Sequence, residues 1–271
     1  MKQFIQYLKQ EEKTRATIQK YQRDVTKFLN YVNGQPLTKQ IVIDYKQYLI
    51  NQQYKVSSIN SMLASINAYF KFIEREELKV KQLKQQKSIY LDEDQNLTRQ
   101  EYLQLLKVCE KHHKTRLSLI MQTICSSGIR ISELPFITVE AIKKREVIVS
   151  LKGKIRTVFI VNKLAKKLLS YAKTHKIKSG SIFVTKKQKL INRSNIWRDM
   201  KKLCEEANVN PKKVYPHNLR HLFAKTYYSK EKDLAVLADL LGHSNINTTR
   251  IYIKTSCNEH KEIVEKMHLL L

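Results

Sequence analysis

The sequence predicts a mainly helical protein of two modules, with one small antiparallel β-sheet in the second module. Three observations lead to this fold class. Residues 1–83 carry apolar side chains at helical spacing, whereas the lysine-rich residues 84–96 carry no such stripe. Residues 146–161 alternate instead, around a Lys-Gly-Lys turn, as a β-hairpin does. We therefore divide the chain into a helical domain at 1–83, a linker at 84–96 and a larger domain at 97–271.

The first domain is expected to be a small helical bundle. Its apolar stripes predict three amphipathic helices, at residues 14–32, 37–50 and 56–78, and a shorter one near residues 4–8. Helices that are each apolar on one side bury those sides against one another.

The second domain opens with a capping box, because Thr98 is followed three residues later by Glu101. A helix through residues 117–123 is expected to end near Gly128. After the hairpin, a further short strand is possible at residues 181–184, and the rest is expected to be helical.

Composition and charge narrow the class of protein. The chain has 271 residues, of which 42% are hydrophobic, so it is long enough to bury a substantial core. It has 51 Lys and Arg residues against 24 Asp and Glu, a net charge of +27. Such an excess attracts nucleic acid or an anionic membrane surface. The alternative explanation is an ordinary solvated surface rich in lysine.

Several classes of protein are not expected. Every apolar stretch is shorter than the about 20 residues that a membrane span needs. The first residues include acids and lack an uninterrupted apolar core, unlike a signal peptide. The cysteines show no Cys-x-x-Cys spacing, which argues against structural zinc and favours reduced thiols in a cytosol. They are Cys109, Cys125, Cys204 and Cys257.

One motif places an imidazole and a guanidinium on one side of a helix. His217 and Arg220 are three residues apart, and Pro216 suits the first turn, where free backbone N–H groups favour an anion. A phosphate group would fit there. A second pair with this spacing, His113 and Arg116, is interpreted as a coincidence.

Three other residues carry possible chemistry, although each alone is explained by structure. Gly242 predicts a helix end, so His243 lies in the turn that follows, where a structural hydrogen bond is the common role. Tyr252 is one tyrosine among 14, for which packing is the common role. Arg130 follows a glycine turn and lies three residues before Glu133, which predicts either an ordinary ion pair or a guanidinium held rigidly for an anion.

The order and spacing of these motifs resemble the tyrosine recombinases, also called the phage-integrase family. The shared elements are GIRISEL at 128–134, the hairpin, HNLRH at 217–221, LGHSNINTT at 241–249 and Tyr252. The resemblance covers nearly the whole chain, with residues 1–83 similar to the family's core-binding domain. In size and layout it is closest to Xer-type recombinases and to short integrases of mobile elements.

The resemblance implies a covalent mechanism on DNA. Tyr252 would attack a phosphodiester, form a 3′-phosphotyrosyl bond and release a 5′-hydroxyl. Arg130 and Arg220 would neutralise the non-bridging oxygens, His217 would help to accept the tyrosine proton, and His243 would hydrogen-bond the phosphate. An ester is exchanged for an ester of similar energy, so neither ATP nor another cofactor is implied, and no metal.

The resemblance also implies a supporting role for Glu133 and a hairpin lysine as general acid. The family usually has Gly-Lys-Gly at that turn, whereas this chain has Leu151-Lys152-Gly153-Lys154. Lys152 is favoured and Lys154 is its competitor. For either, simple clamping of a phosphate by an exposed hairpin is the alternative.

Double-stranded DNA with specific recombination sites is the expected partner, in the cytoplasm of a prokaryote. The family assembles as a tetramer on DNA, and residues 256–271 would then exchange a C-terminal helix between protomers; packing in the core of the same protomer is the alternative. Further DNA contacts are expected from the first domain, besides Lys154 of the hairpin: Arg15, Lys20, Arg23, Lys55, Ser57, Ser58 and Asn60. A type IB topoisomerase and a DNA-binding protein without catalysis are the alternative functions.

Overall fold

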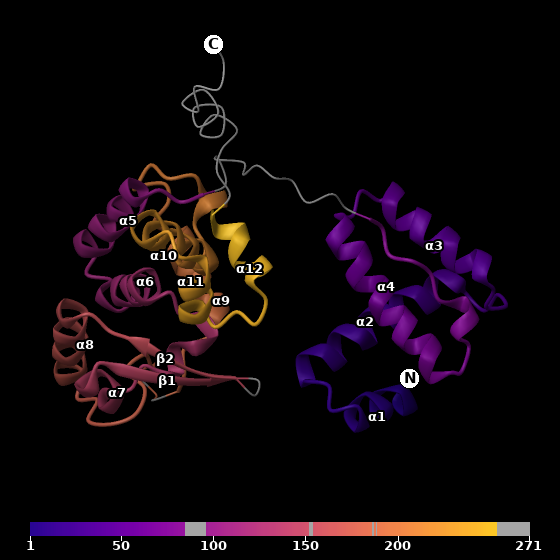
Figure 1. Cartoon of the computed structure of the whole chain (residues 1–271), viewed down its shortest axis with the longest axis horizontal. Helices are drawn as coiled ribbons and strands as arrows, with labels where there is room; N and C mark the ends of the chain where they lie inside the picture. The colour runs from indigo at the N-terminus through magenta and orange to yellow at the C-terminus, as the bar shows by residue number, and fades with distance from the viewer. Residues whose placement is uncertain (85–95, 152–153, 186, 188, 254–271) are drawn as a thin grey trace, which may run out of the picture. The chain divides into compact units, whose positions relative to one another are not determined.

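The computed structural model describes residues 1–84, 96–151, 154–185, 187 and 189–253. The chain divides into two compact units, Met1–Lys87 and Ser88–Leu271 (Figure 1). Within the described residues, no helix is both long enough and apolar enough to cross a membrane. The expected fold class, helical throughout with one small antiparallel sheet, is confirmed.

The first unit is a bundle in which α2 packs against α4. Its elements are α1 (Lys2–Gln10), α2 (Arg15–Val32), α3 (Lys39–Asn51), α4 (Val56–Phe72) and the 3-10 helix η1 (Glu76–Leu78). The side chains of Thr14 and Thr38 accept a backbone N–H at the starts of α2 and α3, which fixes where these helices begin. In the core, the ring of Phe28 packs edge-on against Tyr45 and Phe70.

The chain that follows η1 runs back along α4 and stays attached to it. The side-chain amide of Asn67 donates to the carbonyl of Val80 and accepts from its N–H, at 3.0 and 3.2 Å. Asn60 pairs in the same way with Leu83, at 2.9 and 2.8 Å. An amide side chain carries both an NH2 donor group and a carbonyl acceptor, so each asparagine satisfies both backbone groups of its partner.

The described part of the second unit is mainly helical and contains one hairpin. Its elements are α5 (Arg99–Lys111), α6 (Thr115–Ser127), η3 (Ile131–Phe136), α7 (Val139–Lys144), β1 (Glu146–Leu151), β2 (Lys154–Phe159), α8 (Asn162–Thr174), α9 (Arg193–Lys201), η4 (Pro211–Lys213), α10 (Pro216–Glu231), α11 (Leu234–Leu241), α12 (Ile246–Arg250) and η5 (Ile251–Ile253). The expected capping box is present, since Thr98 and Glu101 exchange hydrogen bonds at the start of α5. Helices α6 and α10 lie side by side at the centre (Figure 1).

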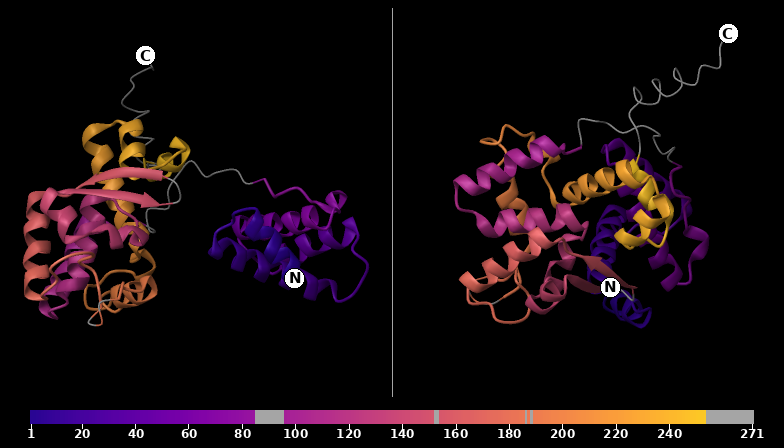
Figure 2. Two further views of the ribbon diagram at one scale, coloured as in Figure 1. Left: turned by 90° about the horizontal axis from the view of Figure 1, so that it is seen from below. Right: turned by 60° about the vertical axis from the view of Figure 1, so that its left-hand side comes forward.

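The two antiparallel strands cross one side of this unit (Figure 2). Val147 and Val149 on β1 and Val158 on β2 are buried, whereas Ile148 and Ile155 are exposed, as a half-buried hairpin requires. The prediction of a possible short strand at residues 181–184 is wrong. Ser181 forms only an isolated bridge with Thr138, and Val184 only one with Leu190.

Gly128 ends α6 in the left-handed region, with φ of +65°. A Cβ atom there would lie 2.5 Å from the ring of Phe223 on α10. The close packing of α6 on α10 therefore depends on the missing side chain, and Arg130 follows this glycine by two residues.

We predict that Gly128→Ala destabilises the second unit by more than the about 1–2 kcal/mol that a left-handed alanine costs, because its methyl group also meets the Phe223 ring. Gly180→Ala is the matched control, since Gly180 has φ of +73° but nothing within 4 Å of its Cβ position. Urea unfolding of both variants measures the difference. Equal losses of stability would contradict the packing argument.

Candidate active site

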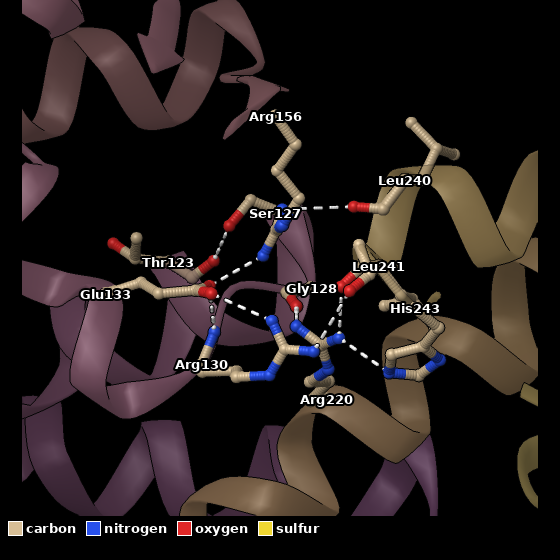
Figure 3. Close-up of polar contacts among 11 residues, drawn as sticks. Thr123, Ser127, Gly128, Arg130, Glu133, Arg156, Arg220, Leu240, Leu241 and His243 are labelled. Atoms are coloured by element: carbon tan, nitrogen blue, oxygen red, sulfur yellow. Dashed lines mark hydrogen bonds and ion pairs between the residues drawn. The ribbon is translucent and has the colours of Figure 1, made fainter. Parts of the chain in front are cut away.

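Arg220 on α10 is fully buried and is held by main-chain carbonyls. Its guanidinium donates to the carbonyl of Gly128 and, at 2.6 Å, to that of Leu241, and a third N–H lies 3.0 Å from Nε2 of His243 (Figure 3). Its Nε atom is buried without a hydrogen-bond partner in the described part of the chain. Burial, then the charge of Arg130, lowers the pKa of Arg220 to about 10, so it remains a cation at neutral pH.

Arg130 and Arg156 share the buried carboxylate of Glu133 (Figure 3). Glu133 accepts from the main-chain N–H and Nη1 of Arg130, at 2.7 and 2.9 Å, and from Nη2 of Arg156 at 2.6 Å. The expected pairing of Arg130 with Glu133 is therefore confirmed. Arg130 stays 37% exposed, so its guanidinium is fixed by the carboxylate yet open to a ligand.

Arg156 is a site residue that sequence analysis missed. It joins the hairpin to the site, because its Nη1 also donates to the carbonyl of Leu240 at 3.0 Å. The Cδ and Nε atoms of Arg156 lie against Gly242, where an added Cβ atom would come within 2.5 and 2.6 Å of them. Strand alternation could have predicted it, because Arg156 lies two residues before the buried Val158 and thus on the same, inward side of β2.

Tyr252, in η5, lies with its hydroxyl 3.4 Å from Nε2 of His217. Its ring is buried and packs in a small cluster with Ala224, Leu237 and Leu241. The packing role and the expected meeting with His217 are thus both present.

Three imidazole rings surround the ring of Tyr252. His243 stacks on it with 5.6 Å between centroids, His217 is tilted at 5.9 Å, and His221 makes an edge contact at 4.2 Å. Sequence analysis did not single out His221 as a site residue, although it lies one helical turn after His217 and thus on the same side of α10.

The three histidines are neutral at neutral pH. Burial, followed by neighbouring charged or imidazole groups, lowers the pKa of His221 and that of His243 to about 4. The same causes, with Arg220 and Arg130 as the charges, lower the pKa of His217. A neutral imidazole has one unprotonated nitrogen, and in the tautomer with the proton on Nδ1 the Nε2 of His217 can accept the proton of Tyr252.

The charges at this site favour a phosphate. The cluster holds three guanidinium groups but a single carboxylate, Glu133, which binds two of them, so it carries an excess of positive charge. The exposed guanidinium of Arg130 is open to such a ligand, and the Nε of Arg220 has no hydrogen-bond partner among the described residues. Among the described residues, no three His, Cys, Asp or Glu side chains lie close enough to hold a metal ion.

The hairpin lysines cannot be placed against this site. Lys152 lies outside the described residues, and Lys154 is the first residue of β2, opposite Leu151 in the register. The other His-x-x-Arg pair lies elsewhere, in a cavity of about 630 Å³ lined also by Tyr171, His175 and Asp199. There Arg116 donates to the carbonyl of Val184.

Four of the expected DNA contacts of the first unit line one cavity of about 420 Å³: Lys20, Arg23, Ser57 and Ser58. Arg23 is highly exposed, whereas Lys20 binds the buried carboxylate of Asp24 and the hydroxyl of Ser65.

The other three expected contacts lie at different places on the first unit. Arg15 begins α2 and Lys55 precedes α4, and both are exposed. Asn60 uses its amide on Leu83.

We predict that His221→Phe makes stability less dependent on pH. The unfolded chain protonates His221 near pH 6.5 but the folded chain only near 4, so the free energy of unfolding falls as pH falls through this window. Phenylalanine removes that contribution while it keeps a ring against Tyr252. Urea unfolding at pH 7 and pH 5 tests this. If the free energy of unfolding fell between these pH values by as much in the variant as in the unmodified chain, the prediction would be refuted.

Comparisons with known proteins identify the family. The Phage integrase family model matches residues 95–259, and that of the phage integrase N-terminal SAM-like domain matches residues 1–77. The tyrosine recombinase XerA of Pyrococcus furiosus is 29% identical, over 100% of this chain and 94% of the relative. The tyrosine recombinase XerD of Vibrio vulnificus is 24% identical, over 93% of this chain and 89% of that relative.

Solved structures share the fold. A XerH site-specific recombinase bound to palindromic difH substrate, in a post-cleavage complex, has a TM-score of 0.71 at 18% identity, with 91% of this chain and 78% of that chain covered. A lambda integrase tetramer bound to a Holliday junction has a TM-score of 0.74 at 15% identity, with 93% and 75% covered. The chain belongs to the phage integrase family, the tyrosine recombinases.

Proposed function

We propose that this chain is a site-specific recombinase that cleaves and rejoins duplex DNA through a covalent bond between Tyr252 and a 3′-phosphate. One observation carries the proposal: the hydroxyl of Tyr252 lies 3.4 Å from a neutral His217, beside the arginine cluster. A tyrosine with a free pKa of about 10 needs a proton acceptor and a positive environment in order to attack.

We assign to the other site residues the roles that the family resemblance implies, and their contacts support these roles. Arg130 and Arg220 bind the non-bridging oxygens, and His217 accepts the tyrosine proton. His243 hydrogen-bonds the phosphate once DNA is present. Glu133 positions Arg130 through two hydrogen bonds. Donors that are fixed in advance stabilise the charge that develops on the phosphorus-bound oxygens, since they need no reorganisation during the reaction.

The proposal extends to the rest of the chain. Residues 1–83 form a DNA clamp, 84–96 a linker and 97–271 the catalytic domain. In the clamp, Arg23, Ser57 and Ser58 share one cavity, and Arg15 and Lys55 are exposed. We assign all five to phosphate contacts, whereas Lys20 and Asn60 mainly support the unit through their internal bonds. Binding then weakens as salt rises.

The proposed assembly is a tetramer on DNA with residues 256–271 exchanged between protomers, in a prokaryotic cytoplasm. The solved lambda integrase tetramer on a Holliday junction supports a tetramer on DNA by analogy. Residues 254–271 lie outside the described part of the chain.

We predict that Tyr252→Phe binds DNA normally but forms no covalent adduct on a nicked suicide substrate, because it lacks the attacking oxygen. Denaturing electrophoresis of labelled DNA detects the adduct, and a mobility shift measures binding. Tyr227→Phe is the control, since Tyr227 packs beside the same apolar cluster. An adduct that persists in Tyr252→Phe would move the nucleophile elsewhere, with Tyr227 and Tyr228 the next candidates.

We predict that Lys152→Ala slows cleavage of ordinary DNA but not of DNA with a 5′-bridging sulfur at the scissile phosphate. A thiolate leaves without the proton that an alkoxide needs, so the general acid becomes dispensable. Single-turnover rates on the two substrates test this assignment. Rescue of Lys154→Ala, and not of Lys152→Ala, would assign the role to Lys154 instead.

A further inference from the structure

His243 is held at both of its ring nitrogens. Its Nε2 lies 3.0 Å from Nη2 of Arg220, and its Nδ1 lies 2.9 Å from Oγ1 of Thr249. A guanidinium has only donors, so Nε2 must be the acceptor in the first hydrogen bond. The ring is neutral, which leaves its single proton on Nδ1, and Nδ1–H therefore donates to Thr249.

This arrangement is the reverse of the one that a bound phosphate needs. A phosphate oxygen accepts hydrogen bonds, so His243 must present a proton on Nε2 in order to bind it. In this structure that position faces the Arg220 donor, so it has to be the unprotonated nitrogen. A His243 ring that stays neutral therefore has to change tautomer in order to bind a phosphate through Nε2.

Thr249 has the chemistry to accompany that change. Its side chain is fully buried on α12, six residues after His243, so its hydroxyl stays beside Nδ1. A hydroxyl both donates and accepts, so it can bind Nδ1 with either tautomer of the ring. A carbonyl or a carboxylate in the same place would accept only, and would hold the proton on Nδ1.

We propose that Thr249 is a positioning residue that holds His243 through both tautomers, by reversing the direction of one hydrogen bond. In the free protein Nδ1–H donates to Oγ1. When a phosphate takes the Arg220 donor, Nδ1 gives its proton to water, Nε2 gains one from water, and the threonine O–H turns to donate to Nδ1. The number of protons on the ring is unchanged. The second half of this cycle rests on the proposed function.

Thr249 also acts on the nucleophile through His243. The His243 ring stacks on Tyr252 with an angle of 16° between the planes, so a rotated imidazole would displace the tyrosine ring. Holding Nδ1 at one point keeps the ring plane fixed while its proton changes place.

Nitrogen-15 NMR of the histidine rings in the full chain tests the first half without DNA. We expect Nδ1 of His243 to be protonated and its proton protected from exchange with water. Thr249→Val, which has the same shape but no hydroxyl, should lose that protection, and Thr249→Ser should keep it. A protonated Nε2 in the free, unmodified chain would overturn the inference.

Adduct formation on the suicide substrate tests the second half. Loss of one hydrogen bond predicts adducts about tenfold slower in Thr249→Val, and restoration to within about twofold in Thr249→Ser. Thr248→Val is the matched control, because Thr248 is the exposed neighbour and should react normally. Thr249→Ser as slow as Thr249→Val, or Thr249→Val as fast as the unmodified chain, would refute the role.

The two proposals fail separately. If Tyr252→Phe still formed adducts, the proposed role of Tyr252 would be refuted, while the NMR result for the unmodified chain would stand. If Thr249→Val did not fold, the protonated nitrogen of the unmodified chain and the rate of Thr249→Ser would still decide the matter.

Discussion

The second unit depends on how the Arg220 guanidinium is held. Its donors bind the carbonyls of Gly128 and Leu241, at the ends of α6 and α11, and not a carboxylate among the described residues. Carbonyls at a helix C-terminus carry only partial negative charge. They hold the cation in place and offset part of the free-energy cost of removing it from water. Most of its positive charge stays uncompensated and can attract a ligand. The two helix ends and α10 are thereby brought to one point.

A carboxylate serves the other two arginines, and this difference assigns them different tasks. Glu133 binds both Arg130 and Arg156, but only Arg130 remains substantially exposed. Arg156 instead connects the hairpin to the end of α11. Glu133 therefore orients the Arg130 guanidinium toward the ligand and, through Arg156, also anchors the β-hairpin at the site. Losing the acid would leave two cations without their common partner.

Local patterns in the sequence predicted the helices, the capping box and the hairpin, because each depends on neighbouring residues. Arg130, His217, Arg220, His243 and Tyr252 were found only through their order, since packing explained Tyr252 alone just as well. The structure shows why: its ring is in fact packed in a small apolar cluster. Arg156 was missed although strand alternation marked it. Thr249 gave no sign, because its role depends on a turn that brings it back onto His243.

The excess positive charge of the arginine cluster has a thermodynamic consequence. Like charges held together oppose the folded state, and a bound phosphate removes that opposition. DNA binding and folding of the second unit are therefore linked, and the unit gains stability as its site fills. A recombinase built in this way is least stable without DNA, so binding to its own target site also stabilises its fold.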